Sequence, residues 1–262
     1  MNKSKLKKLL EHHYKEFDRS KIEPDPLQFP HRYTNEKDIE ISAFIASIFA
    51  YGTVKQINKT LNLIFSQMEN SPLEYLTSKK ISDIQNSFNS IKHRFYKSED
   101  IICLFKFLRD IYLRNESIKS IFLNAYKQDE NIRDAINSFS KYSIMNLIRL
   151  NNNRLTHGLK FMFPLPEKGS ACKRMNLFLR WMVRKDELDF GLWSEIPTSH
   201  LVIPVDTHIF QIAQKLNLTT QTSVSWKMAS EITENLKGFD KNDPVKYDFA
   251  LCHIGIRKLS FE

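Results

Sequence analysis

Apolar side chains recur at helical spacing along most of the chain, and polar side chains fill the positions between them. Residues 3–17 place Leu6, Leu10 and Tyr14 on one face, which predicts an amphipathic helix. In the segment 98–113 the same spacing follows a serine and an aspartate, residue types that favour a helix start. Further helices are predicted over residues 55–68, 72–78, 81–90, 116–126, 129–138, 140–149, 225–237 and 246–255.

One predicted helix differs because its apolar residues surround the whole helix axis. It follows Asp38 and reads IEISAFIASIFAYG, so we expect it to lie in a core and to end near Gly52. The segment 22–34 contains three prolines and is predicted to be a loop. We expect Gly255 to close the last helix. Because the sequence shows no strand-like alternation longer than a few residues, the predicted fold class is all-α.

The expected organisation is a single compact all-α unit over residues 1–262. No segment has the composition of a flexible linker, so two helical lobes would share an interface. The 262 residues are enough to bury a core, and 42% hydrophobic with 26% charged residues is ordinary for a soluble globular protein. The low glycine content also favours helices over a sandwich of short strands.

The balance of charge narrows the class of partner. Lysine and arginine outnumber aspartate and glutamate by 39 to 30, which gives a net charge of +9 and a pI near 9.3. An excess of this kind favours nucleic acid or another anionic surface as the partner. Lysine-rich faces that contact only solvent are the alternative explanation of the same charge.

The spacing of the cysteines and the lengths of the apolar runs indicate the cellular compartment in which the protein is expected. Cys103, Cys172 and Cys252 are far apart and form no CxxC pair, which disfavours a disulfide framework and an iron–sulfur cluster. No apolar run has the length of a signal-peptide core or of a membrane span. We therefore expect a cytoplasmic protein, associated with the nucleoid if it is bacterial, with no cofactor and no metal.

The stretch 164–218 contains the residues best suited to chemistry. A turn with Pro166 and Gly169 precedes a basic helix, on which Lys173, Arg180 and Arg184 share one face at spacings of seven and four. A helix start is suited to anions, and glycine lets a phosphate approach the backbone closely. A charged face exposed to solvent is the alternative. The residues expected to contact nucleic acid are Lys168, Gly169, Ser170, Arg174, Arg180 and Arg184.

Asp206 is the second candidate in this stretch. In the segment PVDTHIFQIAQKL it stands at the start of a predicted amphipathic helix, where aspartate is a common N-cap and needs no further explanation. The positive end of the helix dipole favours negative charge at this position. A carboxylate held in this way can stabilise an oxocarbenium-like sugar or orient a nucleophile, as glycosidic chemistry requires.

The segments PLPEKGSACK, VDTHIFQIAQKLNL and KYDFALCHIG together resemble the helix-hairpin-helix base-excision DNA glycosylases. The early helix EISAFIASIFAYGTVKQI is similar to a core helix of that family, with AYGT at its polar turn. GSACKRMNLFLRWMVR and DPVKYDFALCHIG also resemble an uncharacterised bacterial family assigned a domain of unknown function. The resemblance covers roughly residues 35–60 and 155–258, with the hairpin element and the catalytic segment at about 155–218.

The resemblance implies a two-lobed helical glycosylase that grips duplex DNA and flips a damaged nucleotide into a cleft. Asp206 would be the essential carboxylate. Lys173 would be an amine nucleophile that forms a Schiff base before strand cleavage, or water would attack instead. The sequence departs from the family in its hairpin, which lacks the double glycine, and in the 33 residues that separate Lys173 from Asp206. Archaeal 8-oxoguanine glycosylases have a comparably long separation.

Aromatic residues in these segments are candidates for stacking an extruded base, although core packing explains most aromatics at helical spacing. They are Tyr51, Trp181, Tyr247 and Phe249. The expected partner is duplex DNA with a damaged base, with no membrane and no evident obligate protein partner. Two alternatives stay open: a non-catalytic binder of structured nucleic acid that retains the glycosylase fold, and a helical protein-interaction module.

Overall fold

Helices account for all the regular structure that the computed structural model describes, which covers residues 3–16 and 18–257, with the backbone alone for 253–257. The β-type pairing in these described residues consists of isolated bridges, and no strand is formed there. The all-α class is therefore confirmed. The contacts divide the chain into two compact units. We call Pro24–Leu165 the central unit, and Met1–Glu23 with Pro166–Glu262 the terminal unit. A shared interface between two lobes stays a prediction. No helix in the described ranges is long and apolar enough to cross a membrane.

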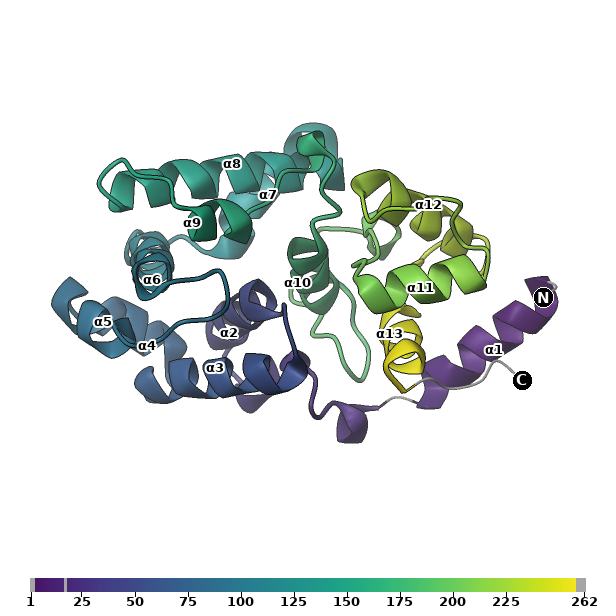
Figure 1. Cartoon of the computed structure of the whole chain (residues 1–262), viewed down its shortest axis with the longest axis horizontal. Helices are drawn as coiled ribbons and strands as arrows, with labels where there is room; N and C mark the ends of the chain where they lie inside the picture. Colours follow the sequence, from purple (N-terminus) through teal and green to yellow (C-terminus); the bar gives the residue numbers. More distant parts are fainter. Residues whose placement is uncertain (1–2, 17, 258–262) are drawn as a thin grey trace. The chain divides into compact units, whose positions relative to one another are not determined.

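The central unit is built around α2, Glu36–Phe49, as its apolar sequence predicts (Figure 1). Every residue of this helix from Ile39 to Phe49 is buried. The other helices of the unit are η2 Pro26–Gln28, η3 Pro30–Arg32, α3 Val54–Gln67, α4 Pro72–Ser78, α5 Ile81–Phe88, α6 Ser98–Leu113, α7 Ile118–Asp129, α8 Ile132–Leu150 and α9 His157–Met162.

Aromatic rings fill much of the core of the central unit. Phe88 and Phe105 stack with their centroids 4.0 Å apart, and both side chains are fully buried. Phe44 of α2 contacts Phe139 and Phe163, each with a centroid distance of 6.1 Å. Such ring pairs add about 0.5–1.5 kcal/mol beyond the area that they bury. The helices of this unit are thus joined mainly by apolar contacts.

Glu40 is the ionisable residue within the buried part of α2, Ile39–Phe49. Its side chain is buried, and its carboxylate accepts hydrogen bonds from the hydroxyl of Tyr112 at 2.6 Å and from the backbone N–H groups of Ile118 and Lys119 at 3.0 and 3.2 Å. The two N–H groups belong to the first turn of α7, where a carboxylate is favoured by the helix dipole. Glu40 therefore serves as a cap for a helix some eighty residues later.

The terminal unit joins the first helix of the chain to the last ones. Its helices are α1 Lys3–Glu16, η1 Arg19–Lys21, η4 Pro166–Lys168, α10 Lys173–Val183, η5 Thr198–His200, α11 Thr207–Lys215, α12 Trp226–Lys237 and α13 Asp248–Arg257. Helix α1 lies beside α13, and it buries Leu6 and Leu10 (Figure 1). Lys246 holds α1 in place through an ion pair with Glu11 of that helix, and it also pairs with Asp240; both distances are 2.9 Å.

Two of the predicted boundaries are wrong. The helices expected at 129–138 and 140–149 are one continuous helix, α8, because no glycine or proline interrupts them and Asn131 caps the start. Within it Ser143 is buried and its hydroxyl donates to the carbonyl of Phe139, so this serine does not break the helix. Gly255 does not close the last helix, because α13 continues to Arg257.

Candidate active site

The turn before α10 is open to solvent, as a phosphate contact would require. Lys168 and Gly169 are exposed, and the space around the α-carbon of Gly169 holds no atom within 4 Å of where a β-carbon would stand. The φ angle of Gly169 is +83°, a conformation that favours glycine. Its carbonyl accepts a hydrogen bond from the N–H of Trp226 at 2.9 Å, which fixes the turn against the start of α12. Ser170 is half-buried, and its hydroxyl accepts from the N–H of Cys172.

Asp206 caps α11, as the sequence predicts. Its Oδ1 accepts hydrogen bonds from the N–H groups of His208 and Ile209, both at 2.9 Å. Helix α11 is in turn anchored by buried apolar residues, among them Ile209 and Ile212. Because one carboxylate oxygen is occupied by the helix start, the direction of the second oxygen is fixed.

Lys173 is the first residue of α10, and the structure brings it to that second oxygen. The Nζ of Lys173 lies 3.5 Å from Oδ2 of Asp206, with side-chain exposures of 31% and 22%. Both groups are therefore partly shielded from water and still accessible. At this distance the two groups form an ion pair, and transfer of a proton from an amine nucleophile to its base needs a closer contact of about 2.6–3.2 Å.

The expectation of an exposed basic stripe along α10 is wrong for Arg180 and Arg184. Both residues are only 3% exposed, because carboxylates from later in the chain surround them. Arg180 pairs with Asp248 and, at 3.3 Å, with Asp189. A buried guanidinium with these partners is not available to a phosphate.

Arg184 continues the same buried network. It pairs with Asp189, with Asp186 at 2.9 Å and with Asp243 at 3.0 Å. These carboxylates raise the pKa of its guanidinium further above its usual value, against the opposing effect of burial. Beyond Lys173, the cations at the same face are buried, and their ion pairs bind α10 to the rest of the terminal unit. Arg174, the other arginine expected to contact DNA, is also buried, at 7% exposed.

Asp248 is a buried carboxyl group of this network, and its pKa is affected by the charge of Asp206 in the candidate site. Burial raises its pKa to about 6, the negative charges of Asp206 and Asp189 act in the same direction, and Arg180 opposes them. Burial also raises the pKa of Asp189. Sequence reasoning missed both residues, because their partners are set by the fold. The sequence does show that Lys173, Arg180 and Arg184 are spaced by seven and four residues. That spacing is the same whether the face they share is exposed or buried, so it did not indicate carboxylate partners.

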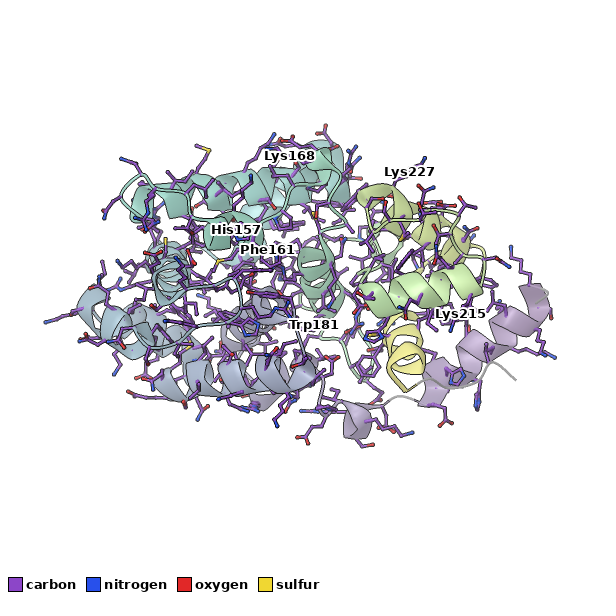
Figure 2. The ribbon with its side chains drawn as sticks, in the orientation of Figure 1. His157, Phe161, Lys168, Trp181, Lys215 and Lys227 are labelled. Carbon is purple, nitrogen blue, oxygen red and sulfur yellow. The ribbon has the colours of Figure 1, made fainter. Side chains whose placement is uncertain are left out.

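Three of the four aromatic candidates are buried, so the expectation that they face an extruded base is wrong. Trp181 and Tyr247 are fully buried, and Phe249 is 6% exposed, because α10 and α13 both pack into the core of the terminal unit. Figure 2 labels Trp181 on α10. The hydroxyl of Tyr247 donates to the carboxylate of Glu11, so this ring serves to dock α1. Tyr51 is half-buried and belongs to the central unit.

Other features of the site stay untested by the geometry. Helix α9 belongs to the central unit and α10 to the terminal unit, so the helix-hairpin-helix element stays a prediction. The residues described here contain no group of three or more histidine, cysteine, aspartate or glutamate side chains that could hold a metal ion. The buried carboxylates of the terminal unit pair with arginines, Asp189 with Arg180 and Arg184 and Asp248 with Arg180.

Comparison with known proteins identifies a family without assigning an activity. No curated protein and no solved structure matches the chain. Residues 25–257 match the family described as protein of unknown function (DUF2400). The match includes α10, Asp206 and α13, and it leaves α1 outside. Because it extends over most of the sequence, the chain belongs to the DUF2400 family.

Proposed function

We propose that the chain is a DNA N-glycosylase that removes a damaged base and uses Lys173 as an amine nucleophile. The observation that carries the proposal is the 3.5 Å approach of the Lys173 Nζ to the Asp206 Oδ2 at the start of two helices. The cap bonds on Oδ1 hold that carboxylate in one orientation. Such fixed geometry is what a glycosidic reaction needs from a carboxylate.

The reaction would proceed in three steps, namely displacement of the base, opening of the sugar ring and elimination of the 3′ phosphate. After it has released one proton to solvent, Lys173 attacks the C1′ carbon of the damaged nucleotide, and the base departs with the electron pair of the glycosidic bond and takes up a proton from solvent. Asp206 stabilises the positive charge that develops on the sugar, and it accepts the proton that the amine releases. The sugar ring then opens to a Schiff base on Lys173. Loss of a proton from C2′ eliminates the 3′ phosphate and cuts the strand.

The nucleic-acid partner has its own support. The chain carries a net charge of +9, and the segments around Gly169 and Asp206 resemble those of DNA glycosylases. Lys168 and Gly169 form an exposed turn whose backbone can approach a phosphate. Figure 2 labels Lys168 in this turn and Lys227 at the start of α12, the helix that the turn contacts.

A second candidate function follows from the same pair of side chains. Lys173 and Asp206 also suit a structural tie between α10 and α11, in a protein that binds nucleic acid without chemistry. The burial of Arg180 and Arg184 in a network that serves the fold favours this alternative. Turnover of a damaged duplex separates the two functions.

The decisive experiment is borohydride trapping on duplexes that each contain one damaged base or an abasic site. We expect a covalent adduct with the wild-type protein and none with Lys173→Gln. Lys215→Gln removes an exposed lysine of α11 and is the matched control, which should form the adduct normally (Figure 2). Because a partly exposed ion pair contributes about 1 kcal/mol or less, Lys173→Gln should still fold.

The Asp206→Asn variant tests the carboxylate separately. Asparagine is as good an N-cap as aspartate, so this variant should retain its stability and its affinity for DNA while losing base release. Base release without an adduct would assign the attack to water in place of Lys173. DNA binding with neither release nor adduct on any duplex of the panel would favour the non-catalytic binder.

A further inference from the structure

An exposed group of aromatic rings in the central unit has no role in the proposed catalytic pair. Phe95 is 48% exposed, and its ring contacts those of Tyr51, His157 and Phe161. We call these four residues the aromatic platform. His157 is also exposed, and Figure 2 labels it with Phe161 on α9. Together the four rings form a contiguous patch that reaches the surface at Phe95 and His157, and a contiguous exposed apolar patch is typical of a binding site.

The backbone presents Phe95 at the tip of a tight two-residue turn. His93 and Tyr96 exchange backbone hydrogen bonds of 2.9 and 2.8 Å, which leaves Arg94 and Phe95 at the tip. Arg94 has a φ angle of +51°, an uncommon conformation for a residue with a side chain. The hydroxyl of Tyr51 donates to the carbonyl of His93 at 2.6 Å and accepts from the N–H of Phe95 at 3.2 Å. The platform is therefore preformed.

The four rings of the platform contact one another in two nearly parallel pairs, which are joined by an edge-to-face contact. Tyr51 and Phe95 are nearly parallel, with an interplanar angle of 11° and a centroid distance of 6.2 Å. His157 and Phe161 are also nearly parallel, at 12° and 6.3 Å. Phe95 meets Phe161 edge to face at 5.1 Å, and the Arg94 guanidinium lies 5.8 Å from the Phe95 centroid. Planar rings together with a guanidinium form a surface on which a nucleobase stacks.

Positive charge is concentrated in the three chain segments that supply the platform, which points to an anionic strand, and we call the cationic side chains of these segments the cationic border. The segments 51–56, 92–100 and 154–161 together hold six cationic side chains and two carboxylates, so their net charge is 6 − 2 = +4. One of the carboxylates, Asp100, is buried, and the other, Glu99, pairs with Arg154 at 3.0 Å. The cationic residues are Lys55, Lys92, Arg94, Lys97, Arg154 and Lys160, all of them exposed.

We propose that the aromatic platform stacks an unpaired nucleobase while the cationic border binds the phosphates of the same strand. Single-stranded nucleic acid supplies both a planar face and a regular negative charge, as an acidic peptide does not. Tyr51 is also a sequence-based candidate for stacking an extruded base, but this inference does not rest on the proposed glycosylase activity, because it requires neither Lys173 nor Asp206. It concerns the central unit alone.

The test compares two DNA probes of the same sequence by fluorescence anisotropy. One is a single strand of about twelve nucleotides with a 2-aminopurine at its centre, a length within the range of known single-strand sites. The other is the blunt, fully paired duplex. We expect Phe95→Ala to weaken single-strand binding about tenfold, since a stacked base contributes roughly 1–3 kcal/mol. Duplex binding should change less than about twofold, because paired bases offer no free face.

Matched variants separate stacking from general damage. Leu113→Ala truncates another side chain of the central unit that is 48% exposed, at the far end of α6, and it should bind both probes as the wild type does. Phe95→Trp should retain single-strand affinity, because it keeps an aromatic face. The quenching of 2-aminopurine on binding should be present in the wild type and Phe95→Trp and absent in Phe95→Ala.

Several results would overturn the inference. An equal loss of affinity for both probes in Phe95→Ala would show that the ring does not stack a base. Displacement of the single strand by polyglutamate at equal charge concentration would point to an acidic peptide instead. Loss of trapping in Lys173→Gln and loss of base stacking in Phe95→Ala are measured with different probes, so failure of one proposal is distinguishable from failure of the other.

Discussion

The central and terminal units hold their helices together by different means. In the central unit the contacts between helices are mainly apolar, with stacked rings such as Phe88 and Phe105 at the centre. In the terminal unit α10 is held by ion pairs, in which Arg180 and Arg184 contact carboxylates from three later segments. An apolar core tolerates small rotations of a helix, whereas a set of buried ion pairs fixes the face that a helix presents.

This difference bears directly on the candidate site. Lys173 and Arg180 lie on the same face of α10, seven residues apart, and Arg184 is the C-cap residue directly after the helix. The buried pairs therefore set the rotation of the helix and with it the direction of the Lys173 amine toward Asp206. We expect the terminal unit to be the more sensitive of the two to loss of a single charged residue.

The largest expected effect is that of Arg184→Met. The change leaves Asp186, Asp189 and Asp243 without their shared cation, and breaking a buried pair in this way costs about 3–5 kcal/mol. Urea denaturation measures the free energy of unfolding. The double variant Arg184→Met with Asp189→Asn should recover part of the loss.

The control for this prediction lies in the central unit. Arg114 pairs with Asp110 at the surface, with side-chain exposures of 49% and 31%, so Arg114→Met should cost about 1 kcal/mol or less. If Arg184→Met were as mild as Arg114→Met, the ion pairs would not be what holds α10.

The second prediction concerns pH. Burial raises the pKa of Asp248 in the folded state to about 6, above its ordinary value of 3.8. Between pH 4 and 6 the folded protein then binds a proton that the unfolded chain does not, so this group makes stability fall as pH rises through that window. The shift corresponds to at most about 3 kcal/mol. Asp248→Asn should remove this contribution.

Urea denaturation of the wild type and Asp248→Asn at pH 4.5, 5.5, 6.5 and 7.5 checks the sign. The wild type should lose stability relative to the variant as pH rises toward 6.5. A constant difference over the four pH values would mean that Asp248 does not titrate in this range. No comparable pH effect is expected from substitutions among the stacked rings of the central unit.

A smaller effect is expected from Phe105→Leu in the central unit. The change keeps an apolar side chain of similar volume and loses the stack with Phe88, so it should cost about 1.5 kcal/mol. Its cost should be the same at pH 5 and pH 7.5 and at low and high salt, because no charge is involved. A strong dependence on either condition would contradict the apolar description of this core.

The smallest effect tests the cap at the candidate site. Asp206→Ala removes the acceptor for two N–H groups of α11 and should cost about 1 kcal/mol, whereas Asp206→Asn should cost a few tenths. Thermal unfolding of both variants measures the difference. Equal stability of the two variants would mean that the carboxylate contributes nothing to the start of α11, and its orientation would then need another explanation.

Much of the fold could be predicted because helices are encoded locally. The bounds expected for 72–78 and 98–113 agree with α4 and α6, and Asp206 caps α11 as its neighbours indicate. Local signals failed where they are weak. The division expected near residue 139 is absent because no glycine or proline interrupts α8, and α13 continues through Gly255.

The sequence by itself determined the all-α class, most helix bounds, the net charge and the cap role of Asp206, because each depends on nearby residues or on composition. Only the tertiary structure decided which side of α10 is buried. The spacing of Lys173, Arg180 and Arg184 puts them in one row, but their exposure depends on Asp243 and Asp248, some sixty residues later. The fold leaves Lys173 beside Asp206 and buries the two arginines because a carboxylate from a distant segment, rather than water, reaches each of them.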